Sequence, residues 1–398
     1  MVARVGVLGA GTMGRGIAQV AALGGFETRL YDAFPEAADE AAVKLRETLA
    51  KGAARGRWSE KEADNASNRI GPAHGIGDLD GCELLIEAAP EDLALKQKLF
   101  AAAAAVCGPT TILASNTSSL RVSDIAAGVP APERVVGMHF FNPPALMKLV
   151  EVVAAERSSA AALTTTTAVA VAMGRTPIRA RDTPGFVANR LARPFALESL
   201  RMLGDGIADA ATIDRVVRVG GGFRMGPFEL IDLIGLDVNL TIARSFFAQG
   251  GEPERWRPSP IQERLVAEGK LGRKSGRGYH SYADGRKRDP DPESGIAAPT
   301  LDPERLAEVD PAANAILPRL FAQIANEAAF ALAEEIASPA DMETATRLGL
   351  NWPLGPLGVT RLLGAARAVA ILRDLEATHG DAYRPAPRLL AEAEAQQP

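Results

Sequence analysis

The chain has 398 residues, more than one ordinary domain, and its 47% hydrophobic and 23% charged residues are typical of globular proteins with substantial cores. Its 44 Lys and Arg residues stand against 49 Asp and Glu, a net charge of −5 that argues against a nucleic-acid partner. The two cysteines, Cys82 and Cys107, give no sign of an oxidising compartment, and we expect both to be small buried hydrophobic side chains.

The chain begins MVARVGVLGAGTMG, in which a short apolar run continues directly into a glycine motif, unlike a signal peptide. No apolar stretch approaches the ~18 residues that span a bilayer. We therefore expect a cytoplasmic protein without a membrane partner.

Short β-rich runs alternate with helical segments in the first part of the chain. The expected strands are residues 4–8, 28–31, 84–88, 111–114, 135–139, 149–153 and 177–180. Stretches between them, such as 36–54 and 93–106, are rich in Ala, Leu, Glu and Lys, which is a helical composition. Alternating βαβ units predict an α/β domain over residues 1–183, with a Rossmann-type, doubly wound and mainly parallel sheet.

The segment Gly9-Ala10-Gly11-Thr12-Met13-Gly14 matches G-x-G-x-x-G between the first expected strand and a helix. Gly9 permits a tight turn, Gly11 lets the backbone approach a pyrophosphate, and Gly14 permits close packing of helix and sheet. The unpaired N–H groups of the helix N-terminus would face the phosphates.

Asp32 ends the second expected strand, 18 residues beyond Gly14. Its carboxylate would accept hydrogen bonds from the adenosine ribose hydroxyls and repel a 2′-phosphate, and no Lys or Arg follows in Ala33-Phe34-Pro35. The pattern favours NAD over NADP, whereas FAD-binding domains share the glycine motif, so the redox partner needs separate evidence.

Two polar motifs, ASNTSSL at 114–120 and HFFNPP at 139–144, stand where strands should end, which is where ligands bind in open α/β sheets. Hydride transfer from an alcohol needs a base for the hydroxyl proton, and a histidine such as His139 can fill that role. Taken alone, a histidine at a strand end is more often structural.

Glu151 stands inside the apolar run Leu149-Val150-Glu151-Val152-Val153. A carboxylate in such a strand is costly unless it is paired. It is therefore either an outward-facing residue of an edge strand or a partner that orients His139 and stabilises its protonated form.

The strand-like runs stop after Thr183-Pro184-Gly185-Phe186, and helices are expected over 187–203 and 211–219. Residues 190–235 align without a gap onto 319–364 with 14 identities in 46 positions, among them Glu198 with Glu327. We interpret the remainder as two tandem all-helical copies, 184–282 and 312–390, joined by a linker over 283–311; similar Ala- and Leu-rich helices are the alternative.

The motifs ASNTSSL, MHFFNPPALMKLVEVV, DTPGFVANR and MGPFELIDLIGLD together resemble the 3-hydroxyacyl-CoA dehydrogenase family over residues 1–282. The bacterial 3-hydroxybutyryl-CoA and 3-hydroxyadipyl-CoA members, some with a duplicated C-terminal domain, are the most similar group. The resemblance implies the catalytic residues Ser118, His139, Glu151 and Asn189. The NAD site it implies comprises Gly9, Gly11, Thr12, Met13, Gly14, Asp32, Glu91, Lys96, Ser118, Asn142 and Lys274. It implies a CoA site at Thr48, Arg55 and Ser118.

The CoA positions depart from the family, which often has serine and lysine where Thr48 and Arg55 stand. The hydroxyl and the charge are kept, and the basic run 51–57 suits an anionic nucleotide tail; a plain solvated helix end is the alternative. No metal site is expected.

The implied reaction is the oxidation of (S)-3-hydroxyacyl-CoA, in which His139 takes the hydroxyl proton, Glu151 stabilises the imidazolium, and Ser118 and Asn189 position the substrate. Because Asn189 comes from the helical part, we expect the site in a cleft between domains. The substrate would be short-chain or 3-hydroxyadipyl-CoA; a dicarboxylyl chain needs a cation, for which Arg190 and Arg193 are nearby candidates, although helical arginines are more often surface residues.

The second helical copy has Pro318 where the first has Asn189, so we expect it to be structural. It would dock on the first copy to make a monomer with an internal pseudo-dimer, with a homodimer as the alternative. Two other functions stay open: a dehydrogenase of a free hydroxy acid, of the gulonate or carnitine type, and a non-catalytic NAD-binding protein.

Overall fold

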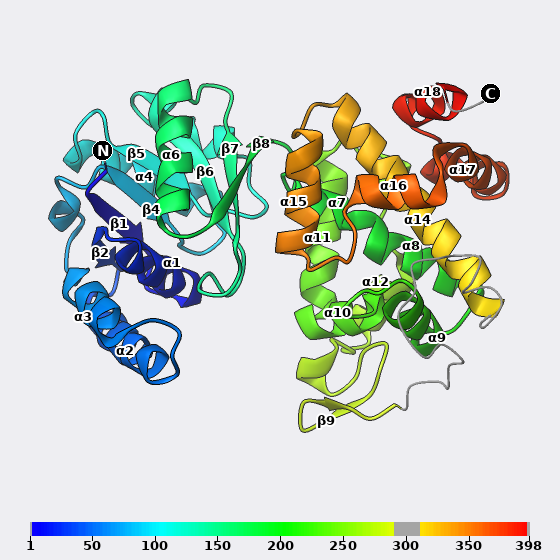
Figure 1. Ribbon diagram of the computed structural model, residues 1–398, viewed down its shortest axis with the longest axis horizontal. Helices are drawn as coiled ribbons and strands as arrows, with labels where there is room; N and C mark the ends of the chain where they lie inside the picture. Colours follow the sequence, from blue (N-terminus) through cyan, green and yellow to red (C-terminus); the bar gives the residue numbers. More distant parts are fainter. Residues whose placement is uncertain (1, 290–310, 396–398) are drawn as a thin grey trace. The chain divides into compact units, whose positions relative to one another are not determined.

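The computed structural model describes residues 2–289 and 311–395, and its contacts divide the chain between Phe186 and Val187 into two units (Figure 1). The expected boundary near residue 183 lies close to this division. None of the described helices is long and apolar enough to cross a membrane.

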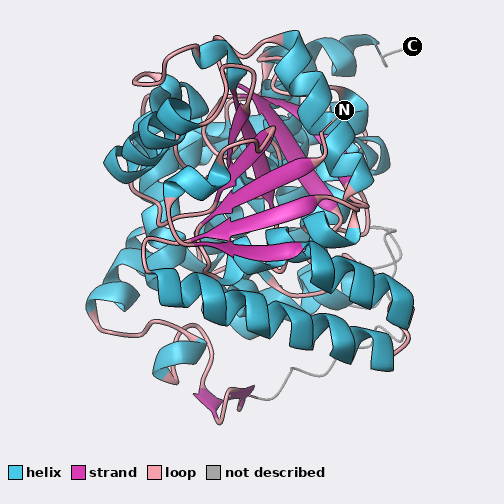
Figure 2. Cartoon of the chain, turned by 90° about the vertical axis from the view of Figure 1, so that its left-hand side faces the viewer, coloured by secondary structure: helices cyan, strands magenta, loops and turns pink. Residues whose placement is uncertain are grey.

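The first unit is built on one eight-stranded sheet in the order β3-β2-β1-β4-β5-β6-β7-β8. The strands are β1 (Arg4–Leu8), β2 (Glu27–Tyr31), β3 (Ile70–Ala73), β4 (Leu84–Glu87), β5 (Ile112–Ser115), β6 (Val135–Phe140), β7 (Leu149–Ala154) and β8 (Thr176–Arg181). Every neighbouring pair is parallel except β6 and β7. Figure 2 shows these strands fanned out by the twist of the sheet.

Helices cover this sheet, as the wholly buried strands β4, β5 and β6 require. They are α1 (Thr12–Leu23), α2 (Pro35–Ala54), α3 (Glu60–Arg69), α4 (Leu93–Val106), α5 (Val122–Ala126) and α6 (Ala160–Ala172), with short 3₁₀ turns η1 (Ile76–Leu79) and η2 (Pro132–Arg134). The predicted doubly wound, mainly parallel α/β fold is confirmed.

Two features of the first unit differ from the sequence prediction. Strand β3 was not predicted, because its sequence Ile-Gly-Pro-Ala carries two residues that interrupt strands; Pro is tolerated there because β3 is an edge strand. Strand β7 is not an edge strand, since β8 lies beyond it, so the outward-facing interpretation of Glu151 is wrong. The prediction for the two cysteines is confirmed, since Cys82 and Cys107 are both buried, and burial raises the pKa of the Cys82 thiol to about 11.

The second unit is mostly helical. Its first part contains α7 (Ala188–Leu191), α8 (Arg193–Gly204), α9 (Ala210–Arg215), the π turn η3 (Val216–Gly220), α10 (Pro227–Ile234), α11 (Leu236–Gln249), η4 (Glu254–Trp256), α12 (Pro260–Ala267) and η5 (Arg273–Ser275). Its second part contains α14 (Pro311–Ala333), α15 (Pro339–Gly349), α16 (Pro356–Leu363), α17 (Ala365–His379), η6 (Asp381–Tyr383) and α18 (Pro387–Ala395).

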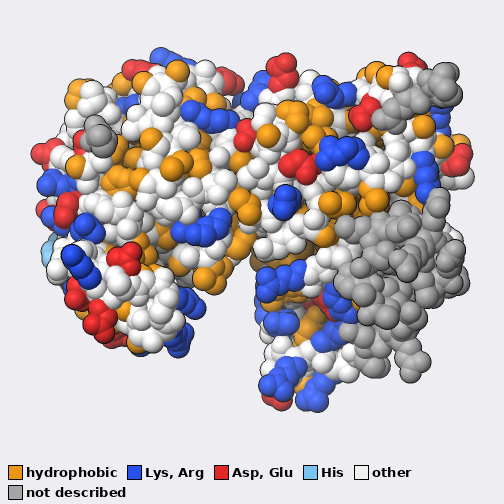
Figure 3. Space-filling view, viewed as in Figure 1, with side chains coloured by type: hydrophobic (Ala, Val, Ile, Leu, Met, Phe, Trp, Pro, Cys, Tyr) orange, Lys and Arg blue, Asp and Glu red, His pale blue; other side chains and the backbone are white. Residues whose placement is uncertain are grey.

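The prediction of wholly helical C-terminal domains needs one correction. Strands β9 (Tyr282–Ala283) and β10 (Arg286–Lys287) form a small hairpin at the start of the predicted linker. Residues 290–310 of that linker lie outside the described residues. In Figure 3, Lys and Arg side chains gather over this hairpin at the lower end of the helical unit.

One hydrophobic core runs through both parts of the helical unit, joining Phe195, Phe223 and Phe228 to Phe321 and Trp352. Phe223 and Trp352 meet edge to face with ring centroids 5.5 Å apart. Helix α14 packs on α7 and α8 of the first part. The two parts therefore share buried surface that neither would bury alone.

Candidate active site

The glycine loop between β1 and α1 is shaped by close backbone contacts. Gly9 has φ +110°, and a Cβ there would lie 2.7 Å from the carbonyl oxygen of Ala88. A Cβ at Gly14 would lie 1.7 Å from the carbonyl oxygen of Gly9, so helix and loop can approach only with glycine at this position. Around Gly11 nothing lies within 4 Å of the Cβ position, which leaves this surface open to a ligand.

Gly11 is also the N-cap of α1, where no side chain satisfies the first N–H groups and no acidic residue lies in the first turn. Such a helix end attracts an anion. Asp32, just past β2, is half-buried and accepts hydrogen bonds from the backbone N–H groups of Ala10, at 2.7 Å, and Phe34, at 3.1 Å. Its carboxylate is thereby fixed beside the glycine loop, at the carboxyl edge of the sheet.

His139 and Glu151 stand directly opposite each other in the antiparallel register of β6 and β7. Their side chains meet with 2.6 Å between Nδ1 and Oε2, and the residues are 5% and 0% exposed. A hydrogen bond to a carboxylate at Nδ1 fixes the imidazole tautomer and leaves Nε2 as the ring nitrogen that can accept a proton.

Two aromatic rings enclose the histidine. The ring centroid of Phe141 lies 4.6 Å from that of His139, and the ring of Phe186 lies 5.8 Å away. These apolar neighbours exclude water from the pair, which strengthens the hydrogen bond between imidazole and carboxylate.

The loop after β5 carries Ser118, and Glu91 organises it. Oε1 of Glu91 accepts hydrogen bonds from the Thr117 hydroxyl at 2.6 Å and from the Ser118 and Ser119 N–H groups at 3.0 and 3.1 Å. The Ser118 residue itself is exposed, and its hydroxyl has no hydrogen bond to another described residue. The loop thus presents a hydroxyl to a ligand at the carboxyl end of β5.

Lys96 is buried and forms an ion pair with Glu91. It is 1% exposed, and its Nζ lies 2.7 Å from Oε1 of Glu87 and 3.2 Å from Oε2 of Glu91. Burial alone would raise the pKa of Glu91, but the Lys96 ammonium and the hydrogen bonds of the loop outweigh it and lower that pKa. Lys96 is therefore a positioning residue in this structure, acting through Glu91.

The end of the HFFNPP motif, which follows β6, is held by the side chain of Arg175. Arg175 donates from Nη1 to the carbonyl oxygens of Pro144 and Met147, both at 2.9 Å. Asn142 lies exposed in this loop, so its amide is accessible to a ligand. Ser118 and Asn142 follow β5 and β6, and His139 lies among the last two residues of β6; the carboxyl ends of these strands lie at the edge that carries the glycine loop.

Of the expected CoA residues, Thr48 lies on α2 and Arg55 is the C-cap of that helix. Trp58, in the turn before α3, donates a 2.7 Å hydrogen bond from Nε1 to the carbonyl oxygen of Leu49 on α2. Thr48 and Arg55 are both exposed and stand seven positions apart, on one face of the helix. The Thr48 hydroxyl donates to the carbonyl of Lys44 at 2.7 Å. An anionic ligand would meet the Arg55 guanidinium at the end of this helix.

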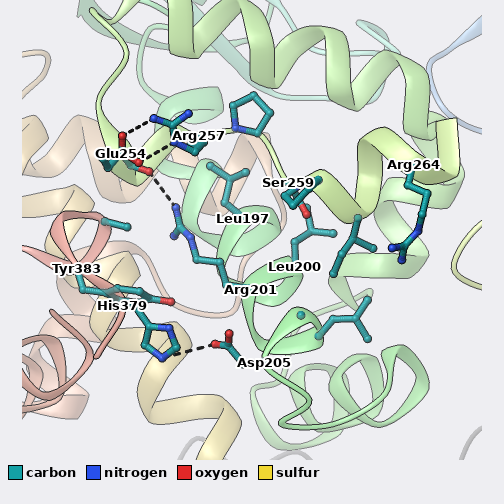
Figure 4. A pocket seen from close by; sticks show the side chains of 16 residues that line it. Leu197, Leu200, Arg201, Asp205, Glu254, Arg257, Ser259, Arg264, His379 and Tyr383 are labelled. Carbon is teal, nitrogen blue, oxygen red and sulfur yellow. Dashed lines mark hydrogen bonds and ion pairs between the residues drawn. The ribbon is translucent and has the colours of Figure 1, made fainter. Parts of the chain in front are cut away.

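Two expected site residues belong to the helical unit. Asn189 lies half-buried in α7. Lys274 is exposed in η5, and its Nζ lies 2.6 Å from Oδ1 of Asp237. A cavity of about 830 Å³ opens in the same unit beside Arg201, Arg257 and Tyr383 (Figure 4), and no expected site residue lines it.

Two residues that hold the strand ends of the site in place, Glu87 and Asn116, were not predicted from the sequence. Glu87 is wholly buried at the end of β4, where Oε2 accepts a 2.6 Å hydrogen bond from the Ser115 hydroxyl. Asn116 joins the ends of β5 and β6 by accepting a 2.7 Å hydrogen bond from the Phe140 N–H. The signal for Glu87 was present, since a carboxylate closes an otherwise apolar strand just as Glu151 does.

Family models match both units. The model described as "3-hydroxyacyl-CoA dehydrogenase, NAD binding domain" matches residues 4–183. The model described as "3-hydroxyacyl-CoA dehydrogenase, C-terminal domain" matches twice, at 185–282 and 316–397.

Individual relatives extend over the same regions. The chain is 35% identical to the 3-hydroxyadipyl-CoA dehydrogenase of Escherichia coli (strain K12), covering 96% of this chain and 95% of that one. It is 41% identical to a probable 3-hydroxybutyryl-CoA dehydrogenase of Bacillus subtilis (strain 168), covering 70% of this chain and 96% of that one. A crystal structure of a 3-hydroxybutyryl-CoA dehydrogenase from Escherichia coli K12 superposes with a TM-score of 0.91 at 34% identity, covering 100% of this chain and 99% of that one.

Proposed function

The chain belongs to the 3-hydroxyacyl-CoA dehydrogenase family and is an NAD-dependent oxidoreductase. We propose that His139 is the general base in the oxidation of (S)-3-hydroxyacyl-CoA to 3-oxoacyl-CoA by NAD. One observation carries this proposal. His139 is the buried partner of Glu151 across β6 and β7, with Nε2 as its free ring nitrogen.

The proton and the hydride leave the substrate in the same reaction. Nε2 of His139 accepts the proton of the 3-hydroxyl as C3 loses its hydride, and the C–O bond becomes a carbonyl. Glu151 lies 2.6 Å from Nδ1 and stabilises the positive charge that the ring then carries. In the reverse direction the imidazolium returns the proton to the oxygen.

NAD, when bound, supplies the acceptor for that hydride. The open surface at Gly11, the uncapped N-terminus of α1 and the carboxylate of Asp32 fit its pyrophosphate and adenosine ribose. Glu91 and Asn142, with Lys96 acting through Glu91, would hold the nicotinamide end.

Ser118 and Asn189 fix the pose of the substrate in this proposal. The free hydroxyl of Ser118 would bond the reacting oxygen or the neighbouring thioester carbonyl, and Asn189 would provide an amide for the same purpose. Thr48 and Arg55 would meet the phosphates of CoA, and Lys274 would join the cofactor residues.

The acyl group is proposed to be short-chain or a C6 dicarboxylyl chain, as the names of the relatives suggest. The test is NADH oxidation by the purified chain with acetoacetyl-CoA, longer 3-oxoacyl-CoA thioesters and 3-oxoadipyl-CoA, beside free 3-oxo acids. Turnover of the thioesters but not of the free acids is expected. Turnover of the free acids alone would contradict the proposal and indicate a dehydrogenase of free hydroxy acids. NADH binding without any turnover would indicate a non-catalytic NAD-binding protein.

We further propose that the two helical copies pack as an internal pseudo-dimer. Positions in the copies differ by 129, so Arg190 corresponds to Arg319 and Glu198 to Glu327. Arg190 binds Glu327, and Arg319 binds Glu198. Such reciprocal contacts, in which equivalent residues exchange partners, define a two-fold symmetric interface.

Further contacts obey the same symmetry. Arg190 also binds Glu334, and Arg319 binds the equivalent Asp205 at 2.7 Å. Phe223 and Trp352, themselves equivalent, contact each other, as residues near a two-fold axis must. Sedimentation velocity across a wide range of protein concentration should therefore give a monomer, and a tight dimer through this same surface would contradict the proposal. A cytoplasmic location stays a prediction.

A further inference from the structure

Two arginines stand near Asn189, but their environments differ. Arg190 is 1% exposed, and its guanidinium is fully engaged, with Nε 2.8 Å from Oε1 of Glu327 and Nη2 2.9 Å from Oε1 of Glu334. Since two carboxylates already neutralise it, Arg190 has no charge to offer to a ligand.

Arg193, the first residue of α8, is buried without a carboxylate. It is 6% exposed, and the ion pairs of the described residues include none with Arg193. Its Nε donates to the carbonyl oxygen of Asn189 at 3.4 Å, its guanidinium stacks 5.0 Å from the ring centroid of Phe246, and its Nη1 is buried without an acceptor. A buried cation that lacks a counter-charge is costly, and stacking on an aromatic ring offsets only part of that cost.

Burial accordingly lowers the pKa of Arg193 to about 10, whereas the carboxylates around Arg190 raise the pKa of that group despite its burial. The contrast indicates that Arg193 is short of an anion that the described protein residues do not supply.

Comparison of the two helical copies distinguishes an arginine that serves packing from one that serves a ligand. The arginine used for packing recurs, since Arg190 corresponds to Arg319, which makes the reciprocal ion pair. Arg193 corresponds to Ala322, and Asn189 to Pro318. Arg193 is therefore present only in the copy that carries Asn189, as expected of a residue that serves the substrate.

We propose that Arg193 binds the distal carboxylate of a dicarboxylyl 3-hydroxyacyl-CoA and so selects this class of substrate. The inference rests on the proposed function, and in particular on Asn189 as a substrate-positioning residue. Nε of Arg193 lies 3.4 Å from the carbonyl oxygen of Asn189, and a C6 diacid thioester carries its carboxylate only a few bonds beyond the reacting carbon. A guanidinium binds a carboxylate through two parallel hydrogen bonds, which gives both affinity and orientation.

The test compares two thioesters of equal chain length, 3-oxoadipyl-CoA and 3-oxohexanoyl-CoA, which differ in the distal carboxylate. For the unaltered chain we expect kcat/KM to favour the dicarboxylyl thioester by about 10-fold or more. Arg193→Met should lower this preference ratio about 10- to 100-fold, because a hydrogen-bonded charge is lost. Arg193→Lys should keep part of the preference, since the charge remains but the two-point geometry does not. The same change at an exposed arginine of α11, Arg244→Met, should leave the ratio unchanged.

A binding measurement needs no variant. Adipyl-CoA, which cannot be reduced, should raise the melting temperature of the unaltered chain more than hexanoyl-CoA does. Equal activity on both C6 thioesters, or an equal loss on both in Arg193→Met, would overturn the assignment of Arg193 while leaving the dehydrogenase intact. Failure of the unaltered chain to reduce any 3-oxoacyl-CoA would instead overturn the proposed function.

Discussion

Arg190 and Glu327 form a buried ion pair although they stand 137 residues apart in the chain. The second carboxylate oxygen of Glu327 accepts hydrogen bonds from Arg255 and from Trp256 Nε1, both at 3.0 Å. One carboxylate on α14 therefore joins three side chains of the first helical copy.

Replacing Glu327 by Gln should destabilise the helical unit strongly. The variant leaves Arg190 and Arg255 with Glu334 as their only carboxylate partner among the described residues, and removing one partner of a buried ion pair costs about 3 kcal/mol. Urea unfolding followed by circular dichroism measures the loss. Glu263→Gln, which removes the exposed partner of Arg244, is the matched control and should cost less than about 1 kcal/mol; equal losses in the two variants would contradict the structural role of Glu327.

Replacing His139 by Gln should abolish most of the turnover. Without an imidazole no group is placed to take the hydroxyl proton, and positioned base catalysis contributes about 10²- to 10⁴-fold. NADH binding, followed by fluorescence, should change little. The control is His74→Gln, an exposed histidine that binds Asp39, and near-normal turnover in His139→Gln would remove this residue from the mechanism.

Glu151→Gln tests the orienting carboxylate separately. The variant can still bond Nδ1, but it cannot stabilise the imidazolium, so kcat should fall by at least about 10²-fold while KM for the thioester stays near its original value. A change confined to KM would show that Glu151 acts on binding rather than on the proton transfer.

Asp32→Asn should relax the choice of cofactor. The neutral amide keeps an acceptor for the Ala10 N–H but no longer repels a 2′-phosphate. Charges 4 Å apart interact by roughly 1 to 4 kcal/mol near a protein surface, so the NAD preference over NADP should fall by about 10-fold or more. The two kcat/KM values give this ratio, and Asp39→Asn, on the exposed face of α2, should not change it.

The pair His280 and Asp214 makes the helical unit sensitive to pH. Burial lowers the pKa of His280, but the 2.7 Å hydrogen bond to Asp214 and its charge raise it more, so the net shift is upward; burial also raises the pKa of Asp214. The folded state thus binds protons more tightly than the unfolded chain. This stability is fully present below the unfolded histidine pKa of about 6.5 and is lost as pH rises through the higher folded value.

The melting temperature should therefore fall as pH rises from about 6 to 8, and His280→Asn should flatten that slope. His379→Asn, whose side chain is partly exposed 3.8 Å from Asp205, is the control and should keep the slope of the unaltered chain. Equal slopes in all three proteins would exclude His280 as the source.

The sequence predicted seven of the eight strands of this sheet. Strands β1, β2, β4, β5, β6, β7 and β8 each lie within two residues of their expected ranges. It could not predict β3, because the pairing of β3 with β2, rather than its own composition, makes Ile-Gly-Pro-Ala a strand. Nor could periodicity reveal that β8 pairs with β7 on the side opposite β6, so that β7 lies inside the sheet.

In the candidate site too, local motifs were predictable from the sequence and contacts between distant segments were not. Local motifs identified the glycine loop, Asp32 and His139, since each is defined by its position at the end of a strand. The environment of Lys96 was not predictable, because its burial between Glu87 and Glu91 depends on contacts formed only after the chain folds. Likewise, only the structure distinguishes Arg190, which has two carboxylate partners, from Arg193, which has none among the described residues.

The reciprocal ion pairs have a genetic consequence. In a homodimer one mutation alters both halves of a symmetric interface at once, whereas Glu198 and Glu327 are encoded by separate codons and can change independently. In a symmetric dimer one substitution would remove both copies of an ion pair. In this chain it removes only one of the two reciprocal pairs, and a second substitution in the other copy can compensate for it. The second copy has thus been free to carry Pro318 and Ala322 while it keeps Arg319 and Glu327, the residues by which it still holds the first.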